Sequence, residues 1–306
     1  MPSSPVPEWR LSPSRTLVLD RPRLLGILNA TPDSFADGGR HDDPIAARDH
    51  AARMLADGAD AIDLGGESTR PGAASVPVDE QIRRVVPVVR AIRALAGDAG
   101  RVPITIDTTR APVARAALDA GADTVNDVSA GADDPDMLPL VARAGCGVIL
   151  MHRARPPRED VYSDRYERPV LAGDVVHAVR AYLEAALARA IAHGVAPACV
   201  MGDPGLGFGK TVEQNLALLR AGGTCLPPGV PLLSALSRKS FVGRVSLGRD
   251  STPDERLAGT LALSLAHLAA GAKVFRVHDV APHAAIFRAW REAGAPHAPA
   301  GSGAGV

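Results

Sequence analysis

Apolar runs rich in β-branched residues recur along the 306-residue chain, and each ends in a polar or acidic residue before a stretch of helical character. The pattern predicts eight short strands, at residues 24–28, 61–64, 104–106, 124–125, 147–150, 198–202, 231–236 and 274–275. Continuous apolar runs of this length are typical of parallel strands that are covered on both faces. We therefore expect eight strands with polar chemistry at their carboxyl ends.

Helical patterns alternate with these runs, at residues 46–56, 80–95, 111–120, 135–144, 174–192, 211–220, 254–270 and 280–292. Pro112 falls in the first turn of the third helix, where the missing N–H costs nothing, and Gly121 follows the end of that helix. The alternation indicates a parallel sheet with right-handed crossovers. Eight such units favour an α/β fold of the closed (β/α)8 TIM-barrel type over an open sheet.

The two ends of the chain differ from this repeating part. The run at 16–20 predicts a short strand or hairpin at the barrel base, within an N-terminal extension of residues 1–22. We expect the barrel over residues 23–293 and a disordered tail, rich in Ala, Gly, Pro and Ser, at 294–306. The irregular stretches 31–44, 68–77 and 154–169 follow strand ends, which makes them candidate loops of the barrel mouth.

Composition narrows the range of partners. Lys+Arg and Asp+Glu both number 34, so the chain has no net charge that would attract nucleic acid or a membrane surface. No apolar run approaches the roughly 18 residues of a membrane helix, and residues 1–15 lack the apolar segment of a signal peptide. Cys146, Cys199 and Cys225 show no CxxC spacing, and we interpret them as buried free thiols of a cytoplasmic protein.

A Gly-rich segment at residues 205–211 invites comparison with a phosphate-binding loop. A Walker A loop needs Gly five residues before its Gly-Lys pair, and Pro204 occupies that position. The GxGxG spacing also misses the dinucleotide-binding fingerprint. We interpret the segment as a tight loop that brings Asp203 to the mouth; the alternative is that Asp203 only forms the turn.

Arg276 and His278 stand two residues apart at the end of the last predicted strand, so their side chains share one face. A cation beside an imidazole suits an anionic oxygen cluster such as a phosphate. The alternative is a structural ion pair of Arg276 with Asp279 or Asp254. Lys239 adds a further cation near a helix start, where free N–H groups also favour anions.

Asp107, Asn126 and Asp203 end three different strands. Such side chains are costly to bury without partners, so either each satisfies neighbouring groups or together they hold a ligand. A flat heterocycle with an N–H beside an amino group would match the two acceptor oxygens of Asp203. Asn29, otherwise an ordinary turn residue, offers a neutral oxygen to a hard cation such as Mg²⁺.

Taken in order, seven segments resemble the dihydropteroate synthases of folate biosynthesis. They are ILNATPDSF at 27–35, GESTRPG at 66–72, IDT at 106–108, VNDVS at 125–129, DPGLGFGK at 203–210, SRKSF at 237–241 and RVHD at 276–279. The resemblance implies a (β/α)8 barrel, usually a homodimer, that uses Mg²⁺ and small-molecule substrates. It implies a transferase that condenses 6-hydroxymethyl-7,8-dihydropterin diphosphate with 4-aminobenzoate to give 7,8-dihydropteroate and diphosphate.

The family pattern also implies roles for individual residues. The catalytic residues would be Asp107, Asp203 and Lys239. The pterin would be held by Asp107, Asn126, Met151, Asp203, Phe208 and Lys239. The diphosphate would be bound by Asn29, which would also hold the metal, and by Thr69, Arg70, Arg276 and His278. The aminobenzoate would contact Phe35, Thr69, Pro71, Phe208, Lys239 and Ser240.

Two features depart from the family pattern. Gly202 stands where the family usually has an aliphatic residue, which we expect to loosen packing under the pterin, and residues 153–158 form an unusually basic loop. A second hypothesis assigns the same barrel to a protein that delivers a folate methyl group to a corrinoid partner. The segments at 237–240, 69–71 and 29–35 favour the synthase, and the intact Asn29, Thr69 and Lys239 disfavour an inactive paralogue.

Overall fold

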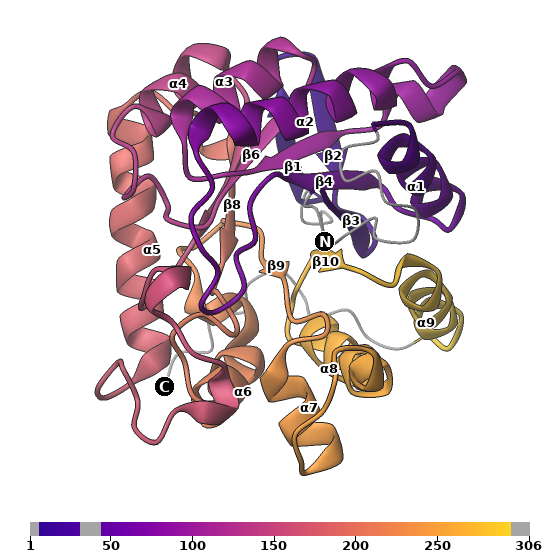
Figure 1. The fold of residues 1–306 in the computed structure, drawn as a ribbon. Coiled ribbons are helices and arrows are strands. Elements are labelled where there is room, and N and C mark those ends of the chain that lie inside the picture. Colours follow the sequence, from indigo (N-terminus) through magenta and orange to yellow (C-terminus); the bar gives the residue numbers. More distant parts are fainter. Residues whose placement is uncertain (1–5, 31–43, 295–306) are drawn as a thin grey trace, which may run out of the picture.

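The computed structural model describes residues 6–30 and 44–294, which form an eight-stranded parallel barrel inside a ring of helices (Figure 1). The barrel strands are β3 (Arg23–Asn29), β4 (Ala61–Gly65), β5 (Ile104–Asp107), β6 (Thr124–Asp127), β7 (Gly147–Met151), β8 (Val200–Asp203), β9 (Leu233–Ser234) and β10 (Val274–Val277). Their hydrogen-bonded order is β8-β7-β6-β5-β4-β3-β10-β9. Every predicted strand is present, and the predicted (β/α)8 fold is confirmed.

The barrel closes between β8 and β9 through a short junction. Gly202 and Leu232 form an isolated parallel bridge, and the Gly202 N–H donates to the Pro231 carbonyl oxygen at 3.0 Å. Elsewhere the neighbouring strands share longer registers, as in the four residue pairs between β7 and β8. The eight strands therefore form a ring with one thin seam.

The helices surround the strands, as Figure 1 shows. They are α1 (Pro44–Ala56), α2 (Val78–Arg93), α3 (Ala111–Asp119), α4 (Met137–Ala144), α5 (Val175–Ala192), α6 (Val212–Ala221), α7 (Ser240–Leu247), α8 (Leu257–Ala269) and α9 (Val280–Glu292). Short 3₁₀ turns occupy Gly97–Arg101, Pro157–Glu159, Ser163–Arg165, Pro197–Cys199, Gly222–Cys225 and Asp254–Arg256. The eight predicted helical stretches are present, and α7 is an additional helix of which only the start was anticipated.

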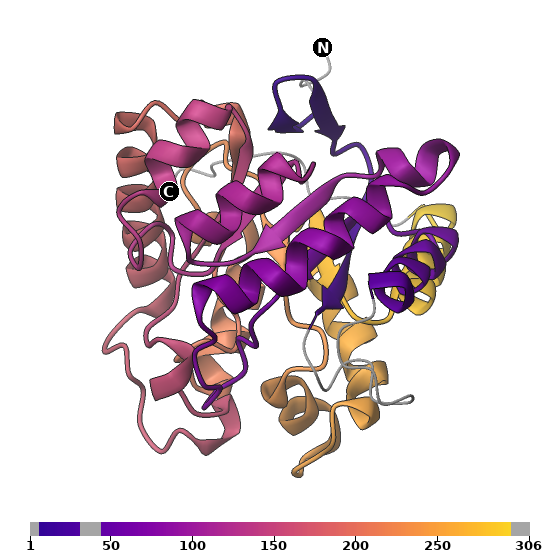
Figure 2. The same ribbon diagram turned by 45° about the horizontal axis from the view of Figure 1, so that its top comes forward.

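The N-terminal segment forms a hairpin at one end of the barrel (Figure 2). Strands β1 (Glu8–Ser12) and β2 (Arg15–Val18) pair antiparallel. Trp9 and Leu11 of β1 are buried against residues at the amino-terminal ends of barrel strands, including Leu25 and Val274. The Trp9 indole N–H also donates to the Cys199 carbonyl oxygen at 2.9 Å. The hairpin thus closes the base and leaves the carboxyl ends of the strands as the accessible mouth.

The packing around Gly202, where the sequence differs from the family pattern, is not loose as expected. A Cβ atom on Gly202 would lie 2.8 Å from Leu226 Cδ2 and 3.3 Å from Val230 Cγ1, because these side chains already fill the space. The expectation of loosened packing is therefore wrong, since Leu226 supplies the missing bulk from a neighbouring loop.

Two further findings concern the described residues. Cys146, Cys199 and Cys225 are buried and free, as predicted. No helix in this part of the chain is both long and apolar enough to cross a membrane. The predicted tail at 294–306 lies, apart from its first residue, outside the described residues.

Candidate active site

The polar strand ends predicted from the sequence meet at the mouth of the barrel. Asp107 ends β5, Asn126 lies on β6 and Asp203 ends β8, and all three are buried. The side chain of Arg276, on β10, is only 16% exposed to solvent. Asn29 ends the adjacent β3 and is half-buried.

Arg276 is held between two carboxylates. Its Nε donates to Asp63 Oδ2 at 2.5 Å, and its Nη2 donates to Asp107 Oδ2 at 2.7 Å. The alternative pairing of Arg276 with Asp279 or Asp254 is wrong, because both of those carboxylates pair with Arg238. The two partners of Arg276 instead lie on β4 and β5, on the interior of the barrel.

Asp63 is the residue that the sequence reasoning missed. It is fully buried, and besides Arg276 it faces the Asn126 amide, whose Nδ2 lies 3.4 Å from Asp63 Oδ2. It lies inside an apolar run, whereas the predicted site residues lie at the ends of such runs. A carboxylate in the middle of a strand that is otherwise apolar was the available signal, since such a group is rarely buried unpaired.

One carboxylate oxygen of Asp107 is left without a partner. Its Oδ1 is buried and has no hydrogen-bond partner among the described residues. Burial raises the pKa of Asp107 to about 7, although Arg276 acts in the opposite direction, and the nearby Asp63 raises the pKa further. An unpaired buried acceptor is costly, so the geometry favours a ligand that brings an N–H or a positive charge to this oxygen.

Asp203 forms the turn after β8 and is at the same time a buried carboxylate at the mouth. Its Oδ1 accepts a hydrogen bond from the Gly205 N–H at 2.7 Å, so it does form the turn after β8. Burial raises the pKa of Asp203, and the positive charge of Lys239 opposes that rise. Asp203 therefore brings a buried carboxylate and a lysine together at the mouth.

Lys239 lies at the amino-terminal end of α7 and reaches across the seam of the barrel to the loop after β8. Its ammonium donates to the Leu206 carbonyl oxygen and lies 4.4 Å from the centroid of the Phe208 ring. Burial lowers the pKa of Lys239 to about 8, with Asp203 acting in the opposite direction. The half-buried ammonium can thus serve as a donor beside an aromatic wall.

Three apolar side chains form a small cluster among these polar groups. Val128, Met151 and Phe208 are buried against one another. Val128 follows β6, Met151 ends β7 and Phe208 lies in the loop after β8, so the cluster spans three neighbouring units of the barrel. A flat ring placed here would have apolar contacts on its faces and hydrogen-bonding groups at its edges.

His278 stands at the opposite side of the mouth from this cluster, directly after β10. Its Nδ1 lies 3.0 Å from the Ser237 hydroxyl oxygen. Burial and the nearby Arg276 and Arg238 lower the pKa of His278 to about 3, and the exposed Arg70 acts in the same direction. His278 is therefore a neutral imidazole in a positively charged neighbourhood.

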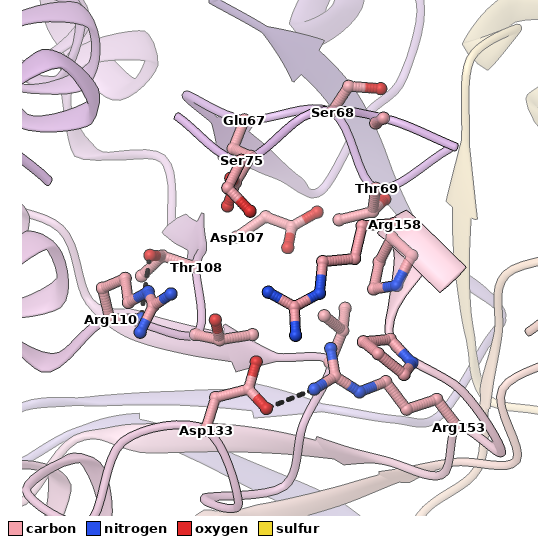
Figure 3. Close-up of a pocket in the computed structure, with 15 residues that line it drawn as sticks. Glu67, Ser68, Thr69, Ser75, Asp107, Thr108, Arg110, Asp133, Arg153 and Arg158 are labelled. Carbon is pink, nitrogen blue, oxygen red and sulfur yellow. Dashed lines mark hydrogen bonds and ion pairs between the residues drawn. The ribbon is translucent and has the colours of Figure 1, made fainter. Parts of the chain in front are cut away.

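A cavity of about 380 Å³ opens on the Asp107 side of the mouth (Figure 3). Its lining includes Thr69 and Asp107 together with Arg110, Arg153 and Arg158. Figure 3 shows these three arginines reaching into the same space as Asp107, with Arg153 paired to Asp133. The basic loop at 153–158 therefore borders the site.

The predicted aminobenzoate residues are only partly brought together. Ser240 is buried in the first turn of α7, next to Lys239, and Pro71 is half-buried in the loop after β4. That loop is fastened to the basic loop, because the Gly72 N–H donates to the Pro157 carbonyl oxygen at 2.8 Å. Phe35 lies outside the described residues.

The donor set for a metal is sparse. No group of three or more His, Cys, Asp or Glu side chains suited to a metal ion occurs within residues 6–30 and 44–294. Asn29 contributes a single amide oxygen at the end of β3, beside the strand that carries Arg276. This fits Mg²⁺, which takes few protein ligands and completes its shell with water and phosphate oxygens.

Comparison with known proteins agrees with this geometry. The family model described as "Pterin binding enzyme" matches residues 25–278. The chain is 46% identical to the dihydropteroate synthase of Mycobacterium leprae over 261 residues, covering 84% of this chain and 88% of that protein. It is 40% identical to the enzyme of Escherichia coli K12 over 266 residues, covering 87% and 89%.

Solved structures give the same result. Dihydropteroate synthase of Xanthomonas albilineans with 4-aminobenzoic acid has a TM-score of 0.83 and 39% identity, covering 95% of this chain and 100% of that one. The Burkholderia cenocepacia enzyme complexed with 7,8-dihydropteroate has a TM-score of 0.82 and 38% identity, covering 95% and 98%. The match to a family model over most of the chain, together with these identities, places the chain in a family: it belongs to the pterin-binding enzymes and, among them, to the dihydropteroate synthases.

Proposed function

We propose that the protein condenses 6-hydroxymethyl-7,8-dihydropterin diphosphate with 4-aminobenzoate, releasing 7,8-dihydropteroate and diphosphate. As a dihydropteroate synthase it is a transferase of folate biosynthesis. The observation that carries the reaction course is the buried pair Asp107 and Asp203 at the mouth, with one oxygen of Asp107 unpaired. None of the relatives named above is a methyl carrier, so the corrinoid hypothesis has no support from them.

The pterin ring lies in the slot beside Val128, Met151 and Phe208, in this proposal. Asp203 accepts hydrogen bonds from one edge of the ring, and Asn126 and Lys239 donate hydrogen bonds to the same edge. Asp107 faces the other edge. The support is that all of these side chains converge at the mouth while Asp203 and Asp107 remain buried.

The diphosphate is proposed to lie on the β3 and β10 side of the mouth. Arg276 and the neutral His278 donate to its oxygens, and Thr69 and Arg70 contact it from the loop after β4. Asn29 would hold Mg²⁺, and the ion would supply positive charge to the leaving diphosphate. The positive surroundings of His278 support this position.

The aminobenzoate is proposed to lie outside the pterin, between the loops that carry Phe35 and Pro71 and the start of α7. Its contacts are Phe35, Thr69, Pro71, Phe208, Lys239 and Ser240. Ser240 and Lys239 are adjacent at the amino-terminal end of α7, where free N–H groups favour a carboxylate. That end of α7 is the support for placing the carboxylate of the aminobenzoate there.

The chemistry then follows from charge. The bond between the pterin methylene carbon and the diphosphate oxygen breaks, and the electron pair leaves with the diphosphate. Positive charge spreads into the ring, where the carboxylates of Asp107 and Asp203 stabilise it without reorganising. The amino nitrogen of aminobenzoate forms the new C–N bond and gives up a proton to water. No side-chain nucleophile is needed.

A homodimer and a cytoplasmic location are also proposed. Val245 and Leu247 are exposed apolar residues on α7, which supports a partner surface there. The buried free cysteines support a reducing compartment. Analytical ultracentrifugation of the purified chain decides the first point, because a monomer at micromolar concentration contradicts it.

The direct test is to incubate the protein with both substrates and Mg²⁺ and to measure dihydropteroate by chromatography. We expect product only when both substrates are present, and a loss of at least a hundredfold in rate for Asp203→Asn. An exposed carboxylate, changed in Asp98→Asn, is the matched control and should leave the rate unchanged. If the wild-type protein forms no product, the proposed function is wrong.

A further inference from the structure

Lys210 is a buried cation without an acidic partner. Its side chain is fully buried, and among the described residues its ammonium forms no ion pair, although the carboxylates of Asp203 and Asp160 act through space to raise its pKa. The ammonium instead donates to the carbonyl oxygens of Gly205 at 2.8 Å and Phe208 at 3.0 Å, and that of His152 lies at 3.4 Å. Because burying an ammonium is expensive, these carbonyls must compensate for lost hydration.

The loop around Lys210 differs from a phosphate-binding loop in which of its backbone groups face inward. Gly205, Gly207 and Gly209 all have positive φ, at +68°, +82° and +66°. Their N–H groups donate to side chains of the protein itself: to Asp203 Oδ1 at 2.7 Å, to Asn215 Oδ1 at 2.6 Å and to Asp160 Oδ2 at 2.8 Å. A phosphate loop turns its N–H groups inward to an anion, whereas this loop turns carbonyls inward to its own lysine.

Lys210 also joins two loops at the mouth. A Cβ atom on Gly205 would lie only 1.7 Å from the His152 carbonyl oxygen, so the loop after β8 is pressed against the end of β7. The His152 N–H in turn donates to the Asp203 carbonyl oxygen at 3.0 Å. Because Lys210 has a carbonyl of each loop near its ammonium, it holds them at this separation.

The loop that Lys210 stabilises carries much of the pterin site. Asp203 precedes it, Phe208 lies within it, and its Leu206 carbonyl accepts from Lys239. A shift of the loop would therefore move a carboxylate, an aromatic wall and the acceptor of a lysine together. Asn29, Arg276 and His278 belong to other elements, and the side-chain hydrogen bonds of Arg276 and His278 go to Asp63, Asp107 and Ser237, none of which lies in this loop.

The choice of lysine at this position is informative. Only three of the 34 Lys and Arg residues of the chain are lysines: Lys210, Lys239 and Lys273. A guanidinium is planar and its donors form a fixed fork, whereas an ammonium is compact and directs three donors to the corners of a tetrahedron. Three backbone carbonyls converging on a point inside the protein suit the ammonium.

We propose that Lys210 is a positioning residue for the pterin, which acts by holding the loop after β8 so that Asp203 and Phe208 face the mouth and Lys239 finds its acceptor. This inference rests on the proposed function, because it assigns the pterin to that side of the mouth. It gives the Gly-rich segment a purpose other than phosphate binding.

The first test is Lys210→Met, which removes the charge and the donors at similar volume. We expect its affinity for 6-hydroxymethyl-7,8-dihydropterin, measured by calorimetry, to fall at least tenfold, while affinity for inorganic pyrophosphate with Mg²⁺ stays within twofold. Lys273→Met is the matched control, since Lys273 lies at the amino-terminal end of β10 on the base side of the barrel. Equal losses for both ligands would mean a general loss of structure and would overturn the proposal.

The second test does not depend on folding of the variant. In wild-type protein labelled with ¹⁵N-lysine, Lys210 should give a slowly exchanging ammonium signal at pH 6, below the value of about 7 to which burial lowers its pKa. The signal should shift on addition of the dihydropterin and not on addition of pyrophosphate. An absent signal, or one that the dihydropterin leaves unmoved, contradicts the proposal. A wild-type protein that binds no dihydropterin refutes the proposed function instead.

Discussion

Arg276, Asp63 and Asp107 form a buried group in which two carboxylates share one guanidinium. Whenever both carboxylates are ionised, the group carries one negative charge more than the guanidinium can balance. In the proposed reaction, a pterin that becomes positively charged on losing diphosphate would complete this charge balance, as expected for groups that stabilise a transition state. At the level of single residues, function therefore has a cost in stability.

That cost can be measured at Asp107. Its pKa is raised from 3.8 to about 7 in the folded protein, so the ionised form is disfavoured there and stability falls as the pH rises from about 4 to about 7. We expect Asp107→Asn to increase the free energy of unfolding by about 1 kcal/mol at pH 8 and to have little effect at pH 4. Urea unfolding at both pH values measures this. The same variant should lose binding of the dihydropterin; a variant less stable than wild type at pH 8 would contradict the charge argument.

His278 offers a second prediction at this scale. Because it is neutral and faces the proposed diphosphate, His278→Ala should weaken binding of the pterin diphosphate about tenfold, about the value of one hydrogen bond to a charged group. Binding of the unphosphorylated pterin should be unchanged. Calorimetry with both ligands measures the difference, with the exposed His193→Ala as control. Equal losses of affinity for the two ligands would mean that His278 stabilises the fold or contacts the pterin ring instead.

At the level of elements, we expect a Gly→Ala substitution in the loop after β8 to have a larger effect than the same substitution elsewhere. Gly205→Ala would place a Cβ atom 1.7 Å from the His152 carbonyl oxygen, in addition to the strain of positive φ. Gly229 has a φ of +80° with nothing within 4 Å of its Cβ position, so Gly229→Ala carries the strain alone. We expect about 1 kcal/mol of destabilisation at Gly229 with normal dihydropterin affinity, and loss of dihydropterin binding at Gly205. Similar behaviour of the two variants would show that the loop adapts.

The strands and helices differ in how well the sequence predicts them. Strands β3 to β8 and β10 could be predicted because buried parallel strands are continuous apolar runs that end in polar residues. Strand β1 was missed because its alternating Trp9 and Leu11 stand among polar residues in a Pro/Ser-rich region. Helix α7 was not delimited because it has only eight residues and contains Gly243.

The site was predictable to the same degree and for a related reason. Residues at strand ends, such as Asp107 and Asp203, could be found because barrel topology brings those ends together. The buried Asp63 could be suspected only from its place inside an apolar run, and the partners of Asp63 and Lys210 could not be predicted, because they depend on which side chains and carbonyls lie opposite them. Such pairings depend on register and loop path, which no periodicity in the sequence specifies.

For the molecule as a whole, the two ends of the barrel have separate tasks. The hairpin closes the base with Trp9, whereas the chemistry is at the mouth. Trp9→Ala should therefore lower the free energy of unfolding by about 3–5 kcal/mol while leaving KM for both substrates unchanged in the protein that remains folded. Trp290→Ala, at a half-buried position on α9, should cost less. Thermal unfolding and steady-state kinetics measure both, and a changed KM in Trp9→Ala would show that base and mouth are coupled.

The barrel is joined between β8 and β9 by one bridge, at Gly202 and Leu232. β8 ends in Asp203 and β9 leads to Lys239, so a pterin bound to both residues lies across this joint. Without a ligand, the barrel is therefore weakest at the joint where the pterin is proposed to bind, and we expect local opening motions to begin there. If the pterin binds as proposed, the substrate holds β8 and β9 together during the reaction, and release of the product lets the two strands move apart again.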